Sequence, residues 1–228
     1  MNKKEIHLLF TGDSITDGNR YKDPDKEWDL NHQIGHSFVY VINALLGSLY
    51  PEKHFRFTNR GVSGNRAIDV YSRLDMDFLR FKPDIASFLL GINDGPDRSH
   101  NYHPTSPKKY AQIYRLMLSE ILETLPNIRL VICEPFVLDN PRLDPEFSMW
   151  NKCIHGFQEE TRRIAEDYHA VFVPLQEIFD NACQIQEPSY WSWDGVHPTE
   201  NGHGLIARQW LRHTAHLLDI PCCGQAFL

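Results

Sequence analysis

A serine directly follows a short apolar segment near the start of the chain. Residues 6–10, Ile-His-Leu-Leu-Phe, have the length of a buried strand, and Thr-Gly-Asp-Ser follows at residues 11–14. Gly12 and Asp13 are turn formers, so Ser14 lies just past the end of that strand. In open α/β sheets, ligands bind at the carboxyl ends of the strands. The pattern indicates a sheet that presents Ser14 at its binding edge; an ordinary turn, with Ser14 bonded to local backbone, is the alternative.

Strand and helix patterns alternate along the rest of the chain. Residues 55–59 alternate between apolar and polar side chains like a strand, and further strand patterns occupy residues 84–90, 128–133 and 170–173. Helical periodicity appears over residues 36–50, 67–81, 108–125, 147–168, 175–183 and 199–218. No linker, Ser/Gly tract or internal repeat divides the 228 residues, so we expect a single domain spanning residues 1–228. The alternation predicts a three-layer α/β/α sandwich with about five parallel strands.

Charge and hydropathy exclude several classes of partner. The formal net charge of −7 and the pI of about 5.9 argue against a nucleic-acid-binding surface, which needs a basic patch. No stretch approaches the roughly 20 apolar residues of a membrane helix, and the apolar run after the N-terminus is too short for a signal peptide. We therefore expect a cytoplasmic protein without a nucleic-acid or membrane partner.

The cysteines and histidines predict no metal centre. The five cysteines form an odd set without C-x-x-C spacing, which favours reduced thiols: Cys133, Cys153, Cys183, Cys222 and Cys223. His203, His213 and His216 lie in the last helical pattern, which lacks H-E-x-x-H spacing, so surface or core roles are expected for them. Neither a metal nor a cofactor is predicted.

Three predicted βα turns carry candidate site residues at corresponding places, and a fourth candidate position comes just before the last helix. Ser14, Gly64 and Asn93 each follow one of the first three strands, and Asp194 and His197 precede the last helix. All βα turns of a parallel sheet lie at one edge, so these residues can converge. Together they supply the parts of a serine hydrolase.

Each part has a chemical role in that interpretation. Ser14 is the candidate nucleophile, His197 the base that takes and returns its proton, and Asp194 the carboxylate that orients the imidazole. The oxyanion would accept hydrogen bonds from the backbone N–H groups of Ser14 and Gly64 and from the amide of Asn93. Glycine at position 64 is expected because a side chain would block close backbone approach.

Four sequence blocks resemble those of the SGNH/GDSL hydrolases. They are Gly12-Asp13-Ser14-Ile15, Val62-Ser63-Gly64-Asn65, Gly91-Ile92-Asn93-Asp94 and Asp194-Gly195-Val196-His197-Pro198. Each block is common by chance, but all four occur in order on predicted turns and span nearly the whole chain. The resemblance implies a flavodoxin-like sheet with Ser14, Gly64, Asn93 and His197 as the core of the site and Asp194 as the third triad member.

A narrower resemblance is to the intracellular acetylxylan esterases of that family. It is carried by the Gly-Asp-Ser-Ile-Thr-Asp opening, by residues 59–65, and by Val196-His197-Pro198 followed by Asn-Gly-His at residues 201–203. It implies removal of O-acetyl groups from xylo-oligosaccharides or related carbohydrates through an acyl-enzyme. Two alternatives are a lysophospholipase or thioesterase with a long acyl pocket, and a catalytically inactive carbohydrate-binding protein on the same fold.

The candidate substrate-binding residues are Asp13, Trp191 and Trp193. If the loop before Asp194 is extended, Trp191 and Trp193 point to the same side, and an indole can stack on a sugar. Packing of both rings against the core is the alternative. Asp13 and Asp17 flank the serine, where turn and cap chemistry is the ordinary role. We also expect a homo-oligomer, whose size the sequence does not specify.

Overall fold

The protein is built on one five-stranded parallel sheet. The computed structural model describes residues 5–22, 30–95, 104–140 and 147–221. Its strands, in chain order, are β1 (Ile6–Gly12), β2 (Phe55–Asn59), β3 (Ile85–Leu89), β4 (Arg129–Cys133) and β5 (Val171–Val173). They lie in the order β2-β1-β3-β4-β5, and every neighbouring pair is parallel. This is the flavodoxin-like order, so the predicted fold class is confirmed.

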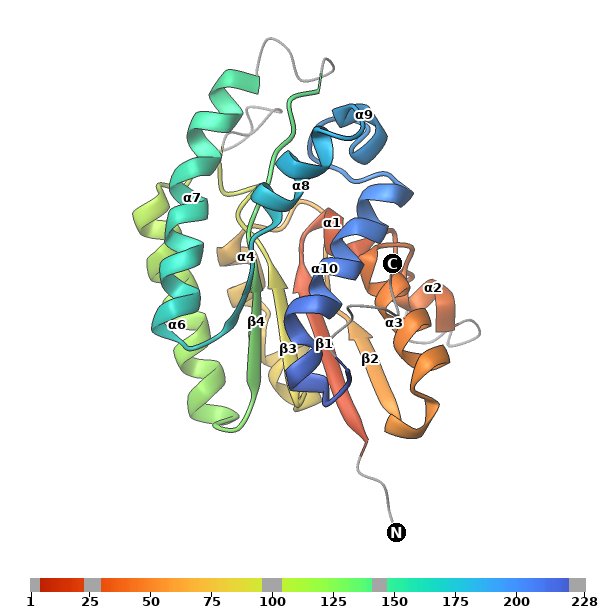
Figure 1. The fold of residues 1–228 in the computed structure, drawn as a ribbon. Helices are drawn as coiled ribbons and strands as arrows, with labels where there is room; N and C mark the ends of the chain where they lie inside the picture. The colour runs from red at the N-terminus through yellow and green to blue at the C-terminus, as the bar shows by residue number, and fades with distance from the viewer. Residues whose placement is uncertain (1–4, 23–29, 96–103, 141–146, 222–228) are drawn as a thin grey trace.

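Helices cover both faces of the sheet (Figure 1). The helices are α1 (Ser14–Asp17), α2 (Leu30–Ile34), α3 (Phe38–Leu49), η1 (Pro51–Lys53), α4 (Ala67–Ser72), α5 (Leu74–Asp77), η2 (Leu79–Phe81), α6 (Pro107–Thr124), α7 (Phe147–Asp167), α8 (Leu175–Cys183), α9 (Pro188–Trp191) and α10 (Glu200–Leu218). Helices α3 and α10 pack together on one face, while α4, α6 and α7 pack in sequence on the other. Within the described residues, no helix is long and apolar enough to cross a bilayer.

Capping side chains fix where the long helices begin. The hydroxyls of Ser37, Ser106 and Thr199 accept hydrogen bonds from backbone N–H groups in the first turns of α3, α6 and α10. These hydroxyls satisfy donors that have no partner inside a helix. Pro107 at the first position of α6 has no N–H to satisfy and has a helical φ.

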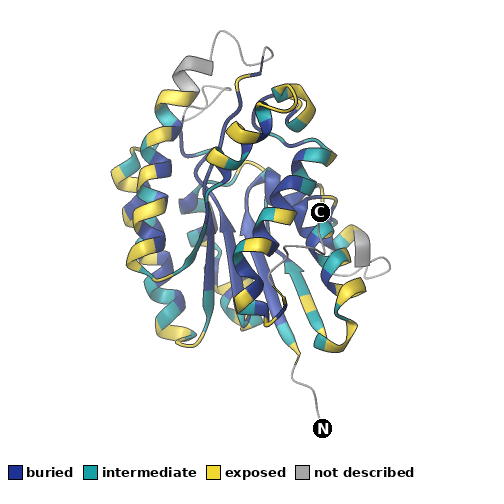
Figure 2. Cartoon of the chain, in the orientation of Figure 1, coloured by how far each residue is buried: buried dark blue, intermediate teal, exposed yellow. Residues whose placement is uncertain are grey.

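The core lies between the sheet and the two helix layers, where Figure 2 shows the buried residues in dark blue. On one face the Trp210 ring of α10 lies 5.2 Å from the Phe10 ring of β1, and its indole N–H donates to the Ser87 hydroxyl on β3 at 2.9 Å. The hydrogen bond satisfies the only polar atom of a fully buried indole. Helix α10, which follows the Asp194–His197 turn, is thereby fastened to the two central strands.

One predicted helix is wrong in its extent. Residues 67–81 form α4, α5 and the short η2 rather than one continuous helix. The break falls at Arg73, which leaves helical geometry with a ψ of 17°, and its guanidinium binds the Arg60 carbonyl and the Asn65 side chain. Phe78 then turns into the core, with only 2% of its surface exposed. Tertiary contacts override the helical periodicity here.

Candidate active site

Ser14 is the first residue of α1, which follows β1 directly. The carboxylate of Asp13 caps this helix by accepting the N–H of Ile15 at 2.9 Å. Ser14 is partly exposed, and its hydroxyl oxygen lies 2.9 Å from Nε2 of His197, although 183 residues separate the two in sequence. The end of β1 and the turn before α10 therefore meet at the edge of the sheet, where the carboxyl ends of the strands lie.

Asp194 holds His197 from the opposite side of the imidazole. Its Oδ2 lies 2.8 Å from Nδ1 of His197, and its Oδ1 accepts the N–H groups of Val196 and His197. A carboxylate only accepts, so Nδ1 carries hydrogen and Nε2 is free to accept from Ser14. Burial opposes ionisation of Asp194, but hydrogen bonds from the His197 side chain and from this turn outweigh burial and hold its pKa below the usual value.

The turn itself is closed by backbone and hydroxyl contacts. The hydroxyl of Ser192, which is fully buried, donates to the carbonyl of His197 at 2.9 Å, and Ser192 pairs with Pro198 in an isolated antiparallel bridge. That bridge consists of two hydrogen bonds: the N–H of Trp193 donates to the same His197 carbonyl, and the N–H of Thr199 donates to the Trp191 carbonyl. Three contacts therefore fix the backbone on which the imidazole is mounted.

Gly64 and Asn93 come from the turns after β2 and β3. Gly64 has a φ of +80°, and no atom lies within 4 Å of where its Cβ would be. The positive φ is a second reason for glycine here, and the expected close approach of a substrate oxygen to its N–H stays a prediction. The Asn93 amide donates to the carbonyl of Asn65 at 3.2 Å, which links the two turns and orients that amide.

Two fully buried carboxylates lie next to the candidate catalytic positions. Asp13 precedes Ser14 and Asp94 follows Asn93, and each accepts one backbone N–H, from Ile15 and Ala67. Burial raises the pKa of each to about 7. The Asp13 side chain has no exposed surface, so helix capping replaces the substrate contact that we expected for it.

The two candidate tryptophans lie in different environments. Trp191 ends helix α9, so the loop is not extended there, and its indole N–H donates to carbonyls of Ala182 and Gln186. It therefore packs α9 against the end of α8. Trp193 is 51% exposed, and its ring stacks on the His197 imidazole with centroids 5.4 Å apart and an interplanar angle of 17°. The expectation that both rings point to one side is wrong.

Other predicted features have simpler roles. His203 is partly buried on α10, and its Nδ1 accepts the N–H of Phe38 at 3.1 Å, a structural contact. Cys133, Cys153 and Cys183 are free thiols. Among the residues that the structure describes, no group of three or more His, Cys, Asp or Glu side chains could hold a metal ion. Cys222 and Cys223 lie outside the described residues.

Sequence reasoning missed one part of the site. It assigned Asp17 to cap chemistry, whereas the carboxylate of this buried residue binds the backbone and hydroxyl of Ser63, next to Gly64. The spacing from Ser14 to Asp17, three residues on a helical turn, was the available signal. The partner on the second turn could not be identified without the fold.

The chain matches the sequence profile of the GDSL-like lipase/acylhydrolase family over residues 10–205. The chain belongs to this family. As a GDSL-like acylhydrolase it is a carboxylic ester hydrolase. It is 32% identical over 207 residues to an acetylxylan esterase from Geobacillus stearothermophilus, a match that covers 90% of this chain and 92% of that protein.

Solved structures of similar proteins share the fold. A structure of the Geobacillus acetylxylan esterase has a TM-score of 0.79 at 31% identity, with 93% of this chain and 96% of that chain covered. An α/β hydrolase enzyme from the metagenome of Lake Arreo has a TM-score of 0.80 at 28% identity and covers 96% and 97%. Two further structures are of catalytic mutants of the Geobacillus enzyme, with a serine and an aspartate, respectively, replaced by alanine.

Proposed function

We propose that this acylhydrolase removes O-acetyl groups from xylo-oligosaccharides or related carbohydrates through an acyl-enzyme on Ser14. The observation that carries the proposal is the hydrogen-bonded chain from Ser14 through His197 to Asp194, at 2.9 and 2.8 Å. The similar acetylxylan esterase supports the substrate class. The solved catalytic mutants of that enzyme replace a serine and an aspartate, and these are two of the three residue types that we assign to the triad of this chain.

The reaction follows from the direction of these bonds. The Ser14 oxygen attacks the acetyl carbonyl carbon while Nε2 of His197 takes the hydroxyl proton. The imidazolium is stabilised by the Asp194 carboxylate and returns the proton to the departing sugar oxygen. The acetyl group is then bonded to Ser14, and a water molecule deprotonated by His197 releases acetate.

Charge that develops on the carbonyl oxygen needs hydrogen-bond donors. The N–H of Ser14 is the first of helix α1 and has no partner within that helix. We assign it to the oxyanion hole with the N–H of Gly64 and the Nδ2 of Asn93. Donors held in place before the reaction stabilise the transition state without reorganisation.

Trp193 is the candidate contact for the sugar. Its half-exposed indole is stacked on the imidazole of His197, so an exposed aromatic ring lies next to the catalytic base. Apolar C–H faces of a pyranose stack on indole, and the indole N–H can donate to a hydroxyl. This arrangement favours an acetylated sugar over the long acyl chain of a lysophospholipase or thioester. The intact Ser14–His197–Asp194 chain disfavours an inactive binding protein.

The test compares, with one preparation of the protein, the hydrolysis of esters of different acyl length and of an acetylated sugar. Hydrolysis rates are measured for p-nitrophenyl acetate, butyrate and octanoate and for an acetylated xylo-oligosaccharide, with Ser14→Ala as the inactive control. We expect acetate to be preferred among the aryl esters and acetate to be released from the oligosaccharide. Preference for octanoate, or no release from the oligosaccharide, contradicts the proposed substrate class.

A cytoplasmic location and a homo-oligomer stay predictions. Cell fractionation tests the location. Light scattering of the purified protein tests the oligomer, and a mass equal to the 26.6 kDa of one chain contradicts it.

A further inference from the structure

Gly64 lies at the exposed tip of the loop after β2, yet an oxyanion donor must be held in place. No hydrogen bond between described residues involves the N–H of Gly64. The contact nearest to it is at Ser63, whose backbone N–H and hydroxyl both donate to Oδ2 of Asp17 at 2.9 Å. Gly64 thus lies between Ser63, which is anchored to Asp17, and Asn65, whose N–H donates to the Val62 carbonyl and whose carbonyl accepts from Asn93.

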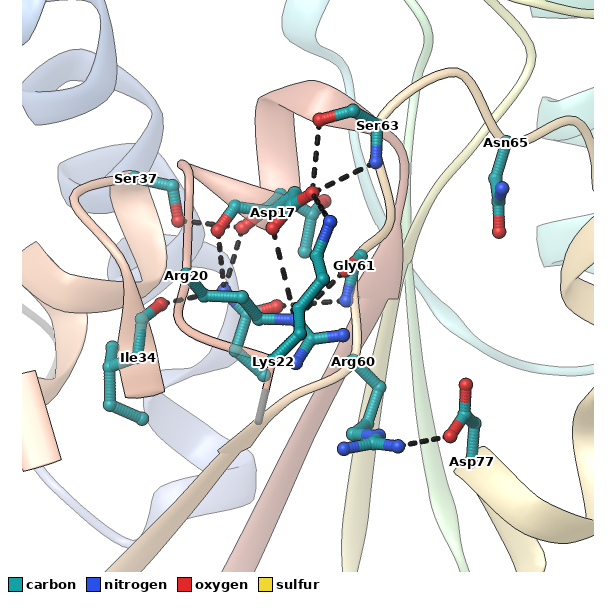
Figure 3. A network of polar contacts seen from close by, with 12 residues as sticks. Asp17, Arg20, Lys22, Ile34, Ser37, Arg60, Gly61, Ser63, Asn65 and Asp77 are labelled. Atoms are coloured by element: carbon teal, nitrogen blue, oxygen red, sulfur yellow. Dashed lines mark hydrogen bonds and ion pairs between the residues drawn. The ribbon is translucent and has the colours of Figure 1, made fainter. Parts of the chain in front are cut away.

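Asp17 belongs to the same short helix as Ser14. It is 1% exposed, and its Oδ2 also accepts a hydrogen bond from Nζ of Lys22 at 2.8 Å (Figure 3). The loop approaches α1 closely at Gly61, where an added Cβ would lie 2.5 Å from the N atom of Asp17. One carboxylate therefore connects the helix that carries the nucleophile with the loop that carries a donor.

The base of this loop is held by separate contacts. The Asn59 amide donates to the carbonyl of Thr16 at 2.7 Å, and its oxygen accepts the N–H of Gly61 at 2.9 Å. Nε of Arg20 donates to the carbonyl of Gly61 at 2.9 Å. Removal of the Asp17 carboxylate thus leaves the base fastened to α1 and Asn65 held by Asn93 and Arg73, and it releases Ser63, the residue before Gly64.

We propose that Asp17 is a positioning residue that fixes the Gly64 N–H relative to Ser14 for transition-state stabilisation. The inference rests on the proposed function. Three hydrogen-bond donors converge on one oxygen, which an anion accommodates better than a neutral group. Burial opposes ionisation, but the bonds from Lys22 and Ser63 outweigh burial and hold the pKa of Asp17 below its usual value.

The experiment compares Asp17→Ala and Asp17→Asn with the wild-type chain on p-nitrophenyl acetate. Titration with diethyl p-nitrophenyl phosphate counts competent sites, so that kcat is expressed per active site. For Asp17→Ala we expect kcat to fall about 10- to 100-fold with little change in KM, because a displaced oxyanion donor acts mainly in the transition state. Asp17→Asn keeps one accepting oxygen and should recover part of the rate.

Two controls separate positioning from a structural role. Lys22→Met removes the ion pair to the half-exposed Lys22 but keeps both Ser63 bonds, so we expect kcat to fall by roughly fivefold or less. The inhibition constant of phenylboronic acid, whose adduct on Ser14 places an oxygen in the hole, should rise in parallel with the loss of kcat/KM. If Asp17 has only a structural role, its replacement lowers the number of competent sites. The kcat/KM and the phenylboronic acid inhibition constant of the remaining sites then stay unchanged.

The outcomes distinguish this proposal from the proposed function. If Ser14→Ala is inactive while Asp17→Ala has the wild-type kcat per competent site, the role of Asp17 is overturned and the esterase mechanism stands. If KM rises and kcat does not change, Asp17 acts on substrate binding and the proposal is again overturned. If Ser14→Ala keeps its activity, the mechanism fails, and the role of Asp17 fails with it.

Discussion

Replacement of His203 should change how the stability of the protein depends on pH. Its Nδ1 accepts the N–H of Phe38, the first residue of α3, so protonation of Nδ1 would break the contact between α10 and α3. Burial, together with the nearby imidazoles of His36 and His197, lowers the pKa of His203 to about 4. His203 is therefore neutral in the folded protein at neutral pH.

The size and sign of the effect follow from linkage. The unfolded chain binds a proton at His203 below pH 6.5, whereas the folded chain does so only below about 4. The unfolded state thus gains stability as the pH falls between these values. The difference of about 2.5 pKa units corresponds to roughly 3 kcal/mol of lost unfolding free energy at pH 4.

The assay is urea unfolding at a series of pH values from 8 to 4. His203→Asn keeps an oxygen near the position of Nδ1, which can accept the Phe38 N–H, but it cannot titrate. We expect the wild type to lose roughly 3 kcal/mol relative to this variant between pH 6.5 and pH 4, and no relative change above pH 7. His216→Asn, which removes an exposed imidazole from the same helix, is the control. A constant difference between wild type and His203→Asn across the range refutes the reasoning.

Three further predictions concern the site and its supports. Asn93→Ala should lower kcat by about 10²- to 10³-fold and leave KM nearly unchanged, because an oxyanion donor acts in the transition state; a raised KM with normal kcat makes Asn93 a binding residue instead. Trp193→Ala should reduce activity on the acetylated oligosaccharide more than on p-nitrophenyl acetate with Tm retained, whereas Trp191→Ala should lower Tm. Equal losses on both substrates that track Tm for Trp193→Ala argue for packing alone. Gly202→Ala places a Cβ 2.1 Å from the Trp191 carbonyl oxygen and should cost about 3 kcal/mol of stability. Gly204→Ala, with open space around the added carbon, should leave stability unchanged. Equal Tm values for these two variants in thermal melts contradict the close approach of Gly202 to the Trp191 carbonyl.

The sheet could be predicted because its strands are short apolar or alternating segments bounded by turn formers. The strand that begins at Ile6 and the one that ends at Cys133 follow this pattern, and their alternation with helices determines a parallel arrangement. The helix predicted over residues 67–81 failed because its periodicity is interrupted by contacts of Arg73 with the preceding loop. Such contacts depend on residues that only the fold brings close.

The sequence was enough to predict which types of residue form the site and which turns carry them. Ser14 and His197 could be paired because the carboxyl ends of all the strands share one edge. The separate environments of Trp191 and Trp193 could not be predicted, because the single turn of α9 rotates one ring onto α8. Asp17 was missed for a related reason: a carboxylate one turn after a nucleophile has the same sequence signature whether it caps a helix or holds a neighbouring loop.

The central claim is that Ser14 is the nucleophile. The most direct measurement is labelling with diethyl p-nitrophenyl phosphate, followed by mass spectrometry of the intact chain and of its peptides. We expect one diethylphosphoryl group per chain, located on Ser14, with esterase activity lost in proportion to labelling and no label on Ser14→Ala. Full labelling at another residue, or a Ser14→Ala variant that still hydrolyses p-nitrophenyl acetate at the wild-type rate, contradicts this claim.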